Sequence, residues 1–295
     1  MYDIQKTFNA KTKEEALRLL KENPGAKAVA GGTDIFVSLK HHKIRDAVLI
    51  NIREVQEFSG VRLMENGNIW IGPVTDFDSV YRDETVRRYI PILANACNTV
   101  GSPQIRHIGT VGGNLCNGAV SADTATAILV LDAVLHVESA DGKRDIPAAE
   151  FHTGPGKTQL KQDEILTGIE IRKENFEGFG GCYLKFGQRN AMEISTLGVA
   201  AAVKLTKDKK HIDCMKMAFG VAAPVPARVP KMEAYVAGKE ISESLFREVS
   251  EHVGEELKPR DSWRASKAFR EQLISVQSVR AMQQAIVNAG GSLDV

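Results

Sequence analysis

Two pairs of adjacent glycines are the residues of this chain best suited to hold a charged ligand. The first pair lies in residues 28–35, Ala-Val-Ala-Gly-Gly-Thr-Asp-Ile, and the second in residues 108–117, Ile-Gly-Thr-Val-Gly-Gly-Asn-Leu-Cys-Asn. Adjacent glycines can reach backbone conformations in which neighbouring N–H groups point into one concavity, and such concavities bind phosphate oxygens. Two of them on one chain predict a ligand with two phosphates in its middle, and hence a dinucleotide.

The residues around the glycines argue against two common kinds of nucleotide site. Neither segment has the G-x-G-x-x-G pattern of nicotinamide-binding Rossmann domains or the G-x-x-x-x-G-K-[ST] pattern of nucleoside triphosphatases. No lysine directly follows the glycines to reach a terminal phosphate. Either turn taken alone is more simply a change of chain direction, but two turns, each beside an apolar strand segment, favour a binding site.

The overall charge argues against nucleic acid as a partner. The chain has 295 residues, with 38 Lys and Arg against 37 Asp and Glu, whereas nucleic-acid-binding domains carry an excess of positive charge. No apolar run approaches the roughly 20 residues needed to cross a bilayer, and the first residues lack the basic-then-apolar order of a signal peptide. We therefore expect a cytoplasmic globular protein with one large domain or two.

The four cysteines do not form a metal-binding pattern. Cys97, Cys116, Cys182 and Cys214 are scattered along the chain, and none belongs to a C-x-x-C pair. Zinc and iron–sulfur sites use closely spaced ligands. We therefore expect four reduced and mostly buried thiols, and no metal bound by this chain.

The elements around the first glycine pair should place it at the end of a strand. Thr12, with Glu15 three residues later, forms a capping box that begins a helix. Residues 27–30 form a short strand that runs into the glycines, residues 35–40 begin a helix or an extended turn, and residues 48–52 form a buried strand. The opening of the chain is thus similar to a βαβ unit.

Alternating and helical patterns predict the elements around the second glycine pair. The dipeptide Asp141-Gly142 between two apolar runs predicts a hairpin. The expected strands are 68–72, 134–138, 144–146 and 164–171, and the expected helices are 76–82, 85–99 and 125–131.

A glycine-rich, charged stretch at residues 173–181 predicts a domain boundary, which we place between residues 176 and 177. Three strands and two long helices are expected beyond it, at 182–186, 198–205, 215–221, 242–257 and 266–288. An apolar stripe of helical period in the last helix should face the core, and it consists of Phe269, Leu273, Val276, Met282 and Ile286.

Around both glycine pairs the sequence resembles the FAD-binding subunits of molybdenum hydroxylases, most of all the medium subunits of bacterial xanthine dehydrogenases. Residues 30–34 fit the family motif A-G-G-T-[DS], and residues 110–114 fit T-[VI]-G-G-N. Further segments match family signatures in the same order, at 119–123, 151–157, 163–166, 219–224 and 262–270. The resemblance therefore covers nearly the whole chain.

The resemblance implies an α+β fold in two parts. Residues 1–176 are expected to form an FAD-binding domain of the p-cresol methylhydroxylase type, in which two α+β subdomains hold the cofactor extended between them. Residues 177–295 are expected to form a C-terminal domain of the CO dehydrogenase flavoprotein type, with a three-stranded antiparallel sheet and a helical bundle. The strands and helices expected from the residue patterns agree with both parts.

The resemblance also implies which residues hold the pyrophosphate of FAD. The first glycine segment would wrap it with backbone N–H groups, with the Thr33 hydroxyl as an additional donor, and the second segment would close on it from the other side. The residues of the two segments expected to bind FAD are Ala28, Val29, Ala30, Gly31, Gly32, Thr33, Asp34, Ile35, Thr110, Val111, Gly112, Gly113 and Asn114.

Five single positions complete the implied site. Asp123 would accept hydrogen bonds from the ribityl chain or adjacent hydroxyl groups, although it could equally be a helix N-cap. Leu166 and Lys185 match family positions near the isoalloxazine and adenine ends, and Lys185 could instead be an ordinary surface lysine. Val100 stands where some relatives carry an aromatic residue. Glu193 stands where relatives carry an acidic residue near the flavin, so it either modulates the flavin or is a solvated loop carboxylate.

The function implied by the resemblance is that of an electron-exit subunit in a heteromeric oxidoreductase. A large partner with a molybdopterin cofactor would oxidise xanthine or another purine, a small partner would carry 2Fe–2S clusters, and FAD on this chain would pass electrons to NAD⁺. No catalytic side chain is expected here, because the flavin carries the chemistry. Two alternatives remain, namely a molybdenum hydroxylase for an aldehyde, nicotinate or carbon monoxide, and a non-catalytic scaffold that has lost its flavin.

Overall fold

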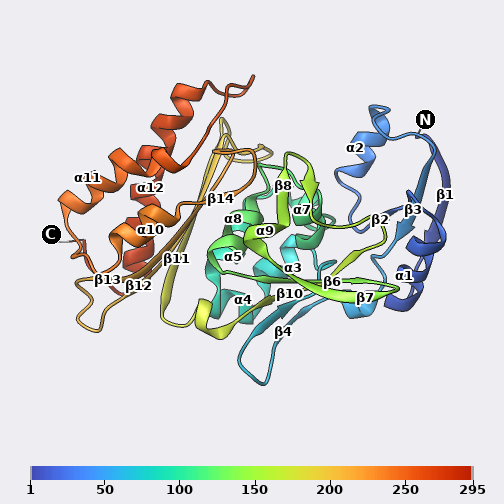
Figure 1. Ribbon diagram of the computed structural model, residues 1–295, viewed down its shortest axis with the longest axis horizontal. Helices are drawn as coiled ribbons and strands as arrows, with labels where there is room; N and C mark the ends of the chain where they lie inside the picture. The colour runs from blue at the N-terminus through green and yellow to red at the C-terminus, as the bar shows by residue number, and fades with distance from the viewer. Residues whose placement is uncertain (1, 294–295) are drawn as a thin grey trace.

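A small parallel sheet forms the N-terminal end of the computed structural model, which describes residues 2–293 (Figure 1). Its strands pair in the order β1-β3-β2, and its elements are β1 (Ile4–Asn9), α1 (Lys13–Glu22), β2 (Lys27–Val29), α2 (Ile35–Lys40) and β3 (Ala47–Asn51). The Thr12 hydroxyl accepts a hydrogen bond from the backbone N–H of Glu15 at 3.2 Å and begins α1 as expected. The βαβ order is confirmed, and the first glycine pair directly follows β2.

An antiparallel sheet occupies the middle of the molecule, with strand order β4-β5-β10-β6-β7. The short helix η1 (Gln56–Phe58) precedes this sheet. The strands are β4 (Val61–Leu63), β5 (Ile69–Ile71), β6 (Val134–Ser139), β7 (Gly142–Pro147) and β10 (Ile165–Ile171). The expected hairpin is confirmed: Ser139 pairs with Gly142, so the chain turns at Ala140 and Asp141.

A group of short helices packs on this sheet. The helices, with the two strands of a small hairpin, are α3 (Phe77–Arg82), α4 (Glu84–Tyr89), α5 (Pro91–Asn98), α6 (Pro103–Arg106), α7 (Val111–Cys116), α8 (Asp123–Val130), α9 (Ala148–Phe151), β8 (His152–Gly154) and β9 (Lys157–Thr158). The single helix expected over residues 85–99 is wrong, because α4 ends before Ile90 and α5 begins at Pro91. Proline has no N–H to continue a helix, but it suits the first position of a new one.

A second antiparallel sheet and three helices form the C-terminal part. The elements are η2 (Lys173–Asn175), β11 (Phe179–Phe186), β12 (Leu197–Leu205), β13 (Ile212–Gly220), β14 (Ala227–Arg228), α10 (Pro230–Val236), α11 (Glu243–His252), η3 (Val253–Glu256) and α12 (Lys267–Asn288). The three expected strands form, and the short β14 adds a fourth at the edge. The end of the helix expected over residues 242–257 is the separate turn η3.

The C-terminal sheet is buried on both faces. Along β12, Val199 and Val203 pack into a core with α10, α11 and α12, whereas Ala200 and Ala202 pack into a core with α5 and α8. Figure 1 shows the sheet between these two groups of helices. Both parts of the chain contribute to the core that contains α5, α8, Ala200 and Ala202. The domain boundary between residues 176 and 177 therefore stays a prediction.

The buried face of α12 differs from the expected stripe. Leu273, Met282 and Ile286 are buried as expected, but Phe269 and Val276 are 41% and 39% exposed. The buried face also contains Ile274, together with small or polar residues that a hydrophobicity pattern overlooks, namely Arg270, Gln277, Ser278, Ala281 and Ala285. Within residues 2–293, no helix is long and apolar enough to cross a membrane.

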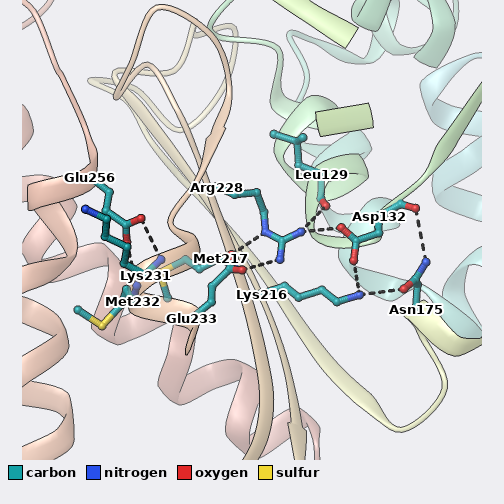
Figure 2. A network of polar contacts seen from close by, with 10 residues as sticks. All are labelled: Leu129, Asp132, Asn175, Lys216, Met217, Arg228, Lys231, Met232, Glu233 and Glu256. Carbon is teal, nitrogen blue, oxygen red and sulfur yellow. Dashed lines mark hydrogen bonds and ion pairs between the residues drawn. The ribbon is translucent and has the colours of Figure 1, made fainter. Parts of the chain in front are cut away.

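An ion-pair network fastens the C-terminal sheet to the end of α8 (Figure 2). Arg228 on β14 lies 2.6 Å from both the Asp132 and Glu233 carboxylates, and Lys216 on β13 lies 2.7 Å from Asp132. Lys216 also donates to the side-chain oxygen of Asn175 at 3.0 Å. The two ion pairs of Asp132 join the sheet to the first part of the chain, whereas the pair between Arg228 and Glu233 joins β14 to α10.

Candidate functional site

Both glycine segments line a cavity of about 880 Å³. Its walls come from the turn after β2, from the segment between α5 and α8, from the loop between β9 and β10, and from the loop before β12. Cavities that hold small molecules and cofactors span roughly 300–1,000 Å³. The space is therefore of the size of a cofactor site.

Nearly all residues that the sequence singled out line this cavity. The lining includes all of residues 28–35, together with Val100, Thr110, Gly112, Gly113, Asn114, Asp123, Leu166 and Glu193. Val111 and Lys185 do not line it. Val111 is buried behind the second glycine pair, where its backbone N–H donates to the carbonyl oxygen of Thr75 at 3.1 Å.

The first glycine pair presents unused backbone donors to the cavity. Within residues 2–293, the backbone N–H groups from Gly31 to Asp34 donate no hydrogen bond to another protein atom. Gly32 has a φ of +73°, in the left-handed region that glycine enters without strain. Backbone N–H groups are normally paired, so this row of donors is suited to an anion with several oxygens.

The second glycine pair does not present such donors, and the expectation that it does is wrong. It begins helix α7, with the Thr110 side chain as N-cap accepting from the N–H of Gly113 at 3.0 Å. The N–H of Gly112 donates to the carbonyl of Pro73 at 2.9 Å, and that of Asn114 to the carbonyl of Thr110 at 3.0 Å. These glycines instead allow close approach, since a Cβ atom at Gly112 would lie 2.4 Å from Pro73.

The two segments touch each other along their backbones. A Cβ atom at Gly31 would lie 2.0 Å from the carbonyl oxygen of Ile108, so only glycine fits there. Arg53, just after β3, holds the second segment in place, because its guanidinium donates to the carbonyl oxygens of His107 and Ile108 at 3.1 Å each. One wall of the cavity is thus built from both segments at once.

Asp123, at the start of α8, is a buried charged residue of the cavity lining. Its carboxylate accepts hydrogen bonds from the hydroxyl of Tyr183 at 2.6 Å and from the hydroxyl of Ser195, and it pairs with the ammonium of Lys185 at 2.8 Å. The N-cap alternative for Asp123 is wrong, because Ala122 occupies that position. The surface alternative for Lys185 is also wrong, because its side chain is only 11% exposed.

Burial sets the protonation of the groups near the cavity. Burial, together with the neighbouring charge of Asp123, raises the pKa of Tyr183 well above its ordinary value, so this phenol stays a hydrogen-bond donor. Burial also raises the pKa of Cys116, which lines the cavity, to about 12. A thiol with this pKa is not a nucleophile at neutral pH, so the site offers no reactive cysteine here.

The remaining predicted positions supply a mostly apolar wall. Leu166 on β10 and Val100 after α5 are both buried, and Phe77 is the aromatic residue of the lining. The Glu193 carboxylate lines the cavity and pairs with the exposed Arg189 at 3.0 Å, so it is neither free nor merely solvated. Its neighbour Met192 is 67% exposed at the same wall.

Several contacts of the site lie outside the sequence motifs. Ser102, Lys161 and Gln162 line the cavity, while Tyr183 and Ser195 support Asp123 from positions 60 and 72 residues away in the sequence. Only the Ser-Pro that begins α6 marks Ser102 in the sequence. Nothing in the local pattern marks the others. In the described chain, residues 2–293, no group of three or more His, Cys, Asp or Glu is placed to hold a metal ion.

Two family models match consecutive parts of the chain. Residues 3–173 match an FAD-binding domain in molybdopterin dehydrogenase, and residues 182–285 match the C-terminal domain of the CO dehydrogenase flavoprotein. The xanthine dehydrogenase FAD-binding subunit of Escherichia coli is 40% identical over 293 residues, which cover 99% of this chain and 100% of that protein. The glyceraldehyde dehydrogenase medium chain of Sulfolobus acidocaldarius is 27% identical over 93% of this chain and 96% of its own.

Solved structures share the fold along almost the whole chain. Chains of carbon monoxide dehydrogenase from Hydrogenophaga pseudoflava and of quinoline 2-oxidoreductase from Pseudomonas putida match with TM-scores of 0.92 and 0.91, at 23% and 21% identity. Each match covers 98% of this chain and 99% of the other. The expected α+β fold is confirmed. The chain belongs to the family of FAD-binding subunits of molybdenum hydroxylases, and FAD is its cofactor.

Proposed function

We propose that the cavity holds FAD with its pyrophosphate against the first glycine pair. The observation that carries this proposal is the row of backbone N–H groups from Gly31 to Asp34, which line the cavity and have no acceptor within residues 2–293. The hydroxyl of Thr33 stands in the same row as a further donor. Two linked phosphates offer the several oxygens that such a row of donors can bind.

The second glycine segment contributes shape and one polar side chain. Gly113 leaves the wall without a side chain, so a ligand can approach the backbone of α7 closely. The side-chain oxygen of Asn114 already accepts from the Thr124 hydroxyl at 2.6 Å. The amide nitrogen of Asn114 is then the part that donates to a phosphate oxygen.

The residues around Asp123 orient the flavin end of the cofactor. We assign Asp123 to a hydroxyl group of the ribityl chain, since a buried carboxylate accepts strongly from O–H donors. Leu166 and Val100 give a flat apolar contact that excludes water. Glu193, held by Arg189, lines the same cavity, and we assign it to tuning the flavin or the access of the acceptor molecule. When bound, FAD supplies the exchange between single electrons and hydride.

We further propose that this chain takes electrons from 2Fe–2S clusters on a small partner and delivers them to NAD⁺. A large partner with the molybdopterin cofactor would oxidise the substrate, most simply xanthine or another purine. The name of the Escherichia coli relative supports the substrate, since that protein is the FAD-binding subunit of a xanthine dehydrogenase. The lack of a metal cluster site within residues 2–293 supports clusters on another chain. The cysteines, none in a disulfide within these residues, support a cytoplasmic location.

The experiment that tests this function is purification of the chain together with its partners from its host. Flavin and iron–sulfur absorption bands, molybdenum by elemental analysis, and NAD⁺ reduction with xanthine are the expected results. Activity only with an aldehyde, nicotinate or carbon monoxide would assign the subunit to another hydroxylase. Assembly without flavin bands would favour the non-catalytic scaffold and would overturn the proposal.

A further inference from the structure

The carboxylate of Asp123 is held by donors on both of its oxygens. Oδ1 accepts from the Tyr183 hydroxyl at 2.6 Å and from the Ser195 hydroxyl, and Oδ2 accepts from the Lys185 ammonium at 2.8 Å. A carboxylate offers about four acceptor sites. Three are occupied within the protein, and the one that remains belongs to Oδ2.

The three donors lie behind the carboxylate, away from the cavity. Asp123 is part of the cavity lining, whereas Tyr183, Ser195 and Lys185 are not. Tyr183 and Ser195 are buried, with 6% and 2% of their surface exposed. Of these four residues, Asp123 is therefore the one that reaches the cavity, and Oδ2 is its oxygen with an acceptor site still open.

Lys185 alone would not fix the direction of that acceptor site. The terminal torsion of an aspartate is broad, so its carboxylate plane rotates unless hydrogen bonds restrain it. Lys185 is itself anchored, because its ammonium also donates to the carbonyl oxygen of Thr99 at 3.0 Å. It balances the charge on Oδ2, whereas the two hydroxyl donors on Oδ1 restrain the plane.

We infer that Tyr183 and Ser195 are positioning residues for the cofactor. They hold the plane of the Asp123 carboxylate so that Oδ2 accepts a hydrogen bond from a hydroxyl group of FAD. The inference rests on the proposed placement of FAD in the cavity, whose ribityl chain carries such hydroxyl groups. Neither residue touches the cofactor; both act through Asp123.

The test is FAD binding by the full chain after its flavin has been removed. Quenching of flavin fluorescence gives the Kd for FAD. The visible circular dichroism of the bound flavin reports the asymmetry of its surroundings in the protein. We expect Tyr183→Phe, which removes only the hydroxyl, to raise the Kd by about tenfold, the equivalent of one hydrogen bond. In an Asp123→Asn background the same change should raise the Kd less than about twofold, because coupled residues are not additive.

A control variant tests the loss of a carboxylate-bonded hydroxyl away from the cavity. Tyr235→Phe removes a hydroxyl that donates to the Glu248 carboxylate at 2.7 Å, on α10 and α11. It should leave the Kd and the circular dichroism of bound FAD unchanged. Ser195→Ala removes the second donor on Oδ1 in a smaller side chain, and it should raise the Kd in the same way if Tyr183→Phe does not fold.

The outcomes separate failure of the inference from failure of the proposed function. If the wild-type chain binds no FAD, the proposed function fails with it. If the wild type binds FAD but neither Tyr183→Phe nor Ser195→Ala changes the Kd, the positioning role is wrong. Equal effects with and without Asp123→Asn would show that these hydroxyls act independently of Asp123, and would also overturn it.

Discussion

Replacing Gly31 by alanine tests whether the contact between the two glycine segments builds this wall of the cavity. A Cβ atom at Gly31 would lie 2.0 Å from the carbonyl oxygen of Ile108 and 2.9 Å from the Cα of Gly109. Both are backbone atoms, and Arg53 holds this backbone through the carbonyl oxygens of His107 and Ile108. No side-chain rotation can therefore relieve the clash.

The size of the effect follows from the distance. Real Cβ atoms essentially never lie closer than 3.0 Å to another atom. Since the Cβ atom at Gly31 would lie 2.0 Å from the Ile108 oxygen, the two segments must move apart by at least 1.0 Å, the difference of the two values. Overpacking of this kind costs roughly 1–3 kcal/mol. We expect Gly31→Ala to lower the free energy of unfolding by about 2 kcal/mol, and the Tm by roughly 4–8 °C if domains of this class lose roughly 2–4 °C per kcal/mol.

Urea unfolding of the full chain, followed by tryptophan fluorescence, measures this change. Gly254→Ala is the matched control, because a Cβ atom there meets nothing within 4 Å and the residue has no positive φ. The control should change the free energy of unfolding by no more than about 0.5 kcal/mol. A value for Gly31→Ala within about 0.5 kcal/mol of the control would refute the idea that this contact is tight.

Three further predictions concern charged and titratable groups. Lys185→Met should lower the free energy of unfolding by about 3 kcal/mol, because it leaves the buried Asp123 carboxylate without its cation. Lys239 forms an exposed ion pair with Glu248 at 3.5 Å, and Lys239→Met should cost less than about 1 kcal/mol in the same urea assay. Equal losses would contradict the buried-pair argument. The hydrogen bond from Arg144 lowers the pKa of Glu164, so its stabilising effect is complete above the unfolded pKa of about 4.3 and is lost as the pH falls through the folded pKa. The Tm difference between wild type and Arg144→Met should therefore shrink below about pH 4, and a difference that grows on acidification would exclude this linkage. The pKa of Cys116, about 12, leaves roughly one thiol in 10,000 ionised at pH 8. Mass spectrometry should therefore find Cys116 unmodified by iodoacetamide under conditions that alkylate glutathione, and prompt alkylation would contradict a pKa raised this far.

Local elements could be predicted where their signals lie within one short stretch of chain. Thr12 caps α1 at the expected residue, because a cap needs only its own hydroxyl and an N–H three residues later. The hairpin at Asp141 depends equally on neighbouring residues. The glycine pairs were found for the same reason, since their motif is continuous.

The contacts that complete the site could not be predicted, because they depend on distant parts of the chain. The N–H of Gly112 donates a hydrogen bond to the carbonyl oxygen of Pro73, and no feature of the glycine motif shows that this carbonyl is near. Tyr183 and Ser195 reach Asp123 only after the C-terminal sheet packs on α8. The predicted buried stripe of α12 was wrong for a similar reason, since Phe269 contacts Phe186 of β11 but stays exposed.

The setting of Asp123 restricts how this subunit can change during evolution. Its carboxylate lies on α8, whereas its cation and both hydroxyl donors come from β11 and the segment before β12. A gene fusion that joins the first half of one relative to the second half of another would place a carboxylate beside partners that were not selected for it. We therefore expect α8 and β11 to exchange between lineages as one unit.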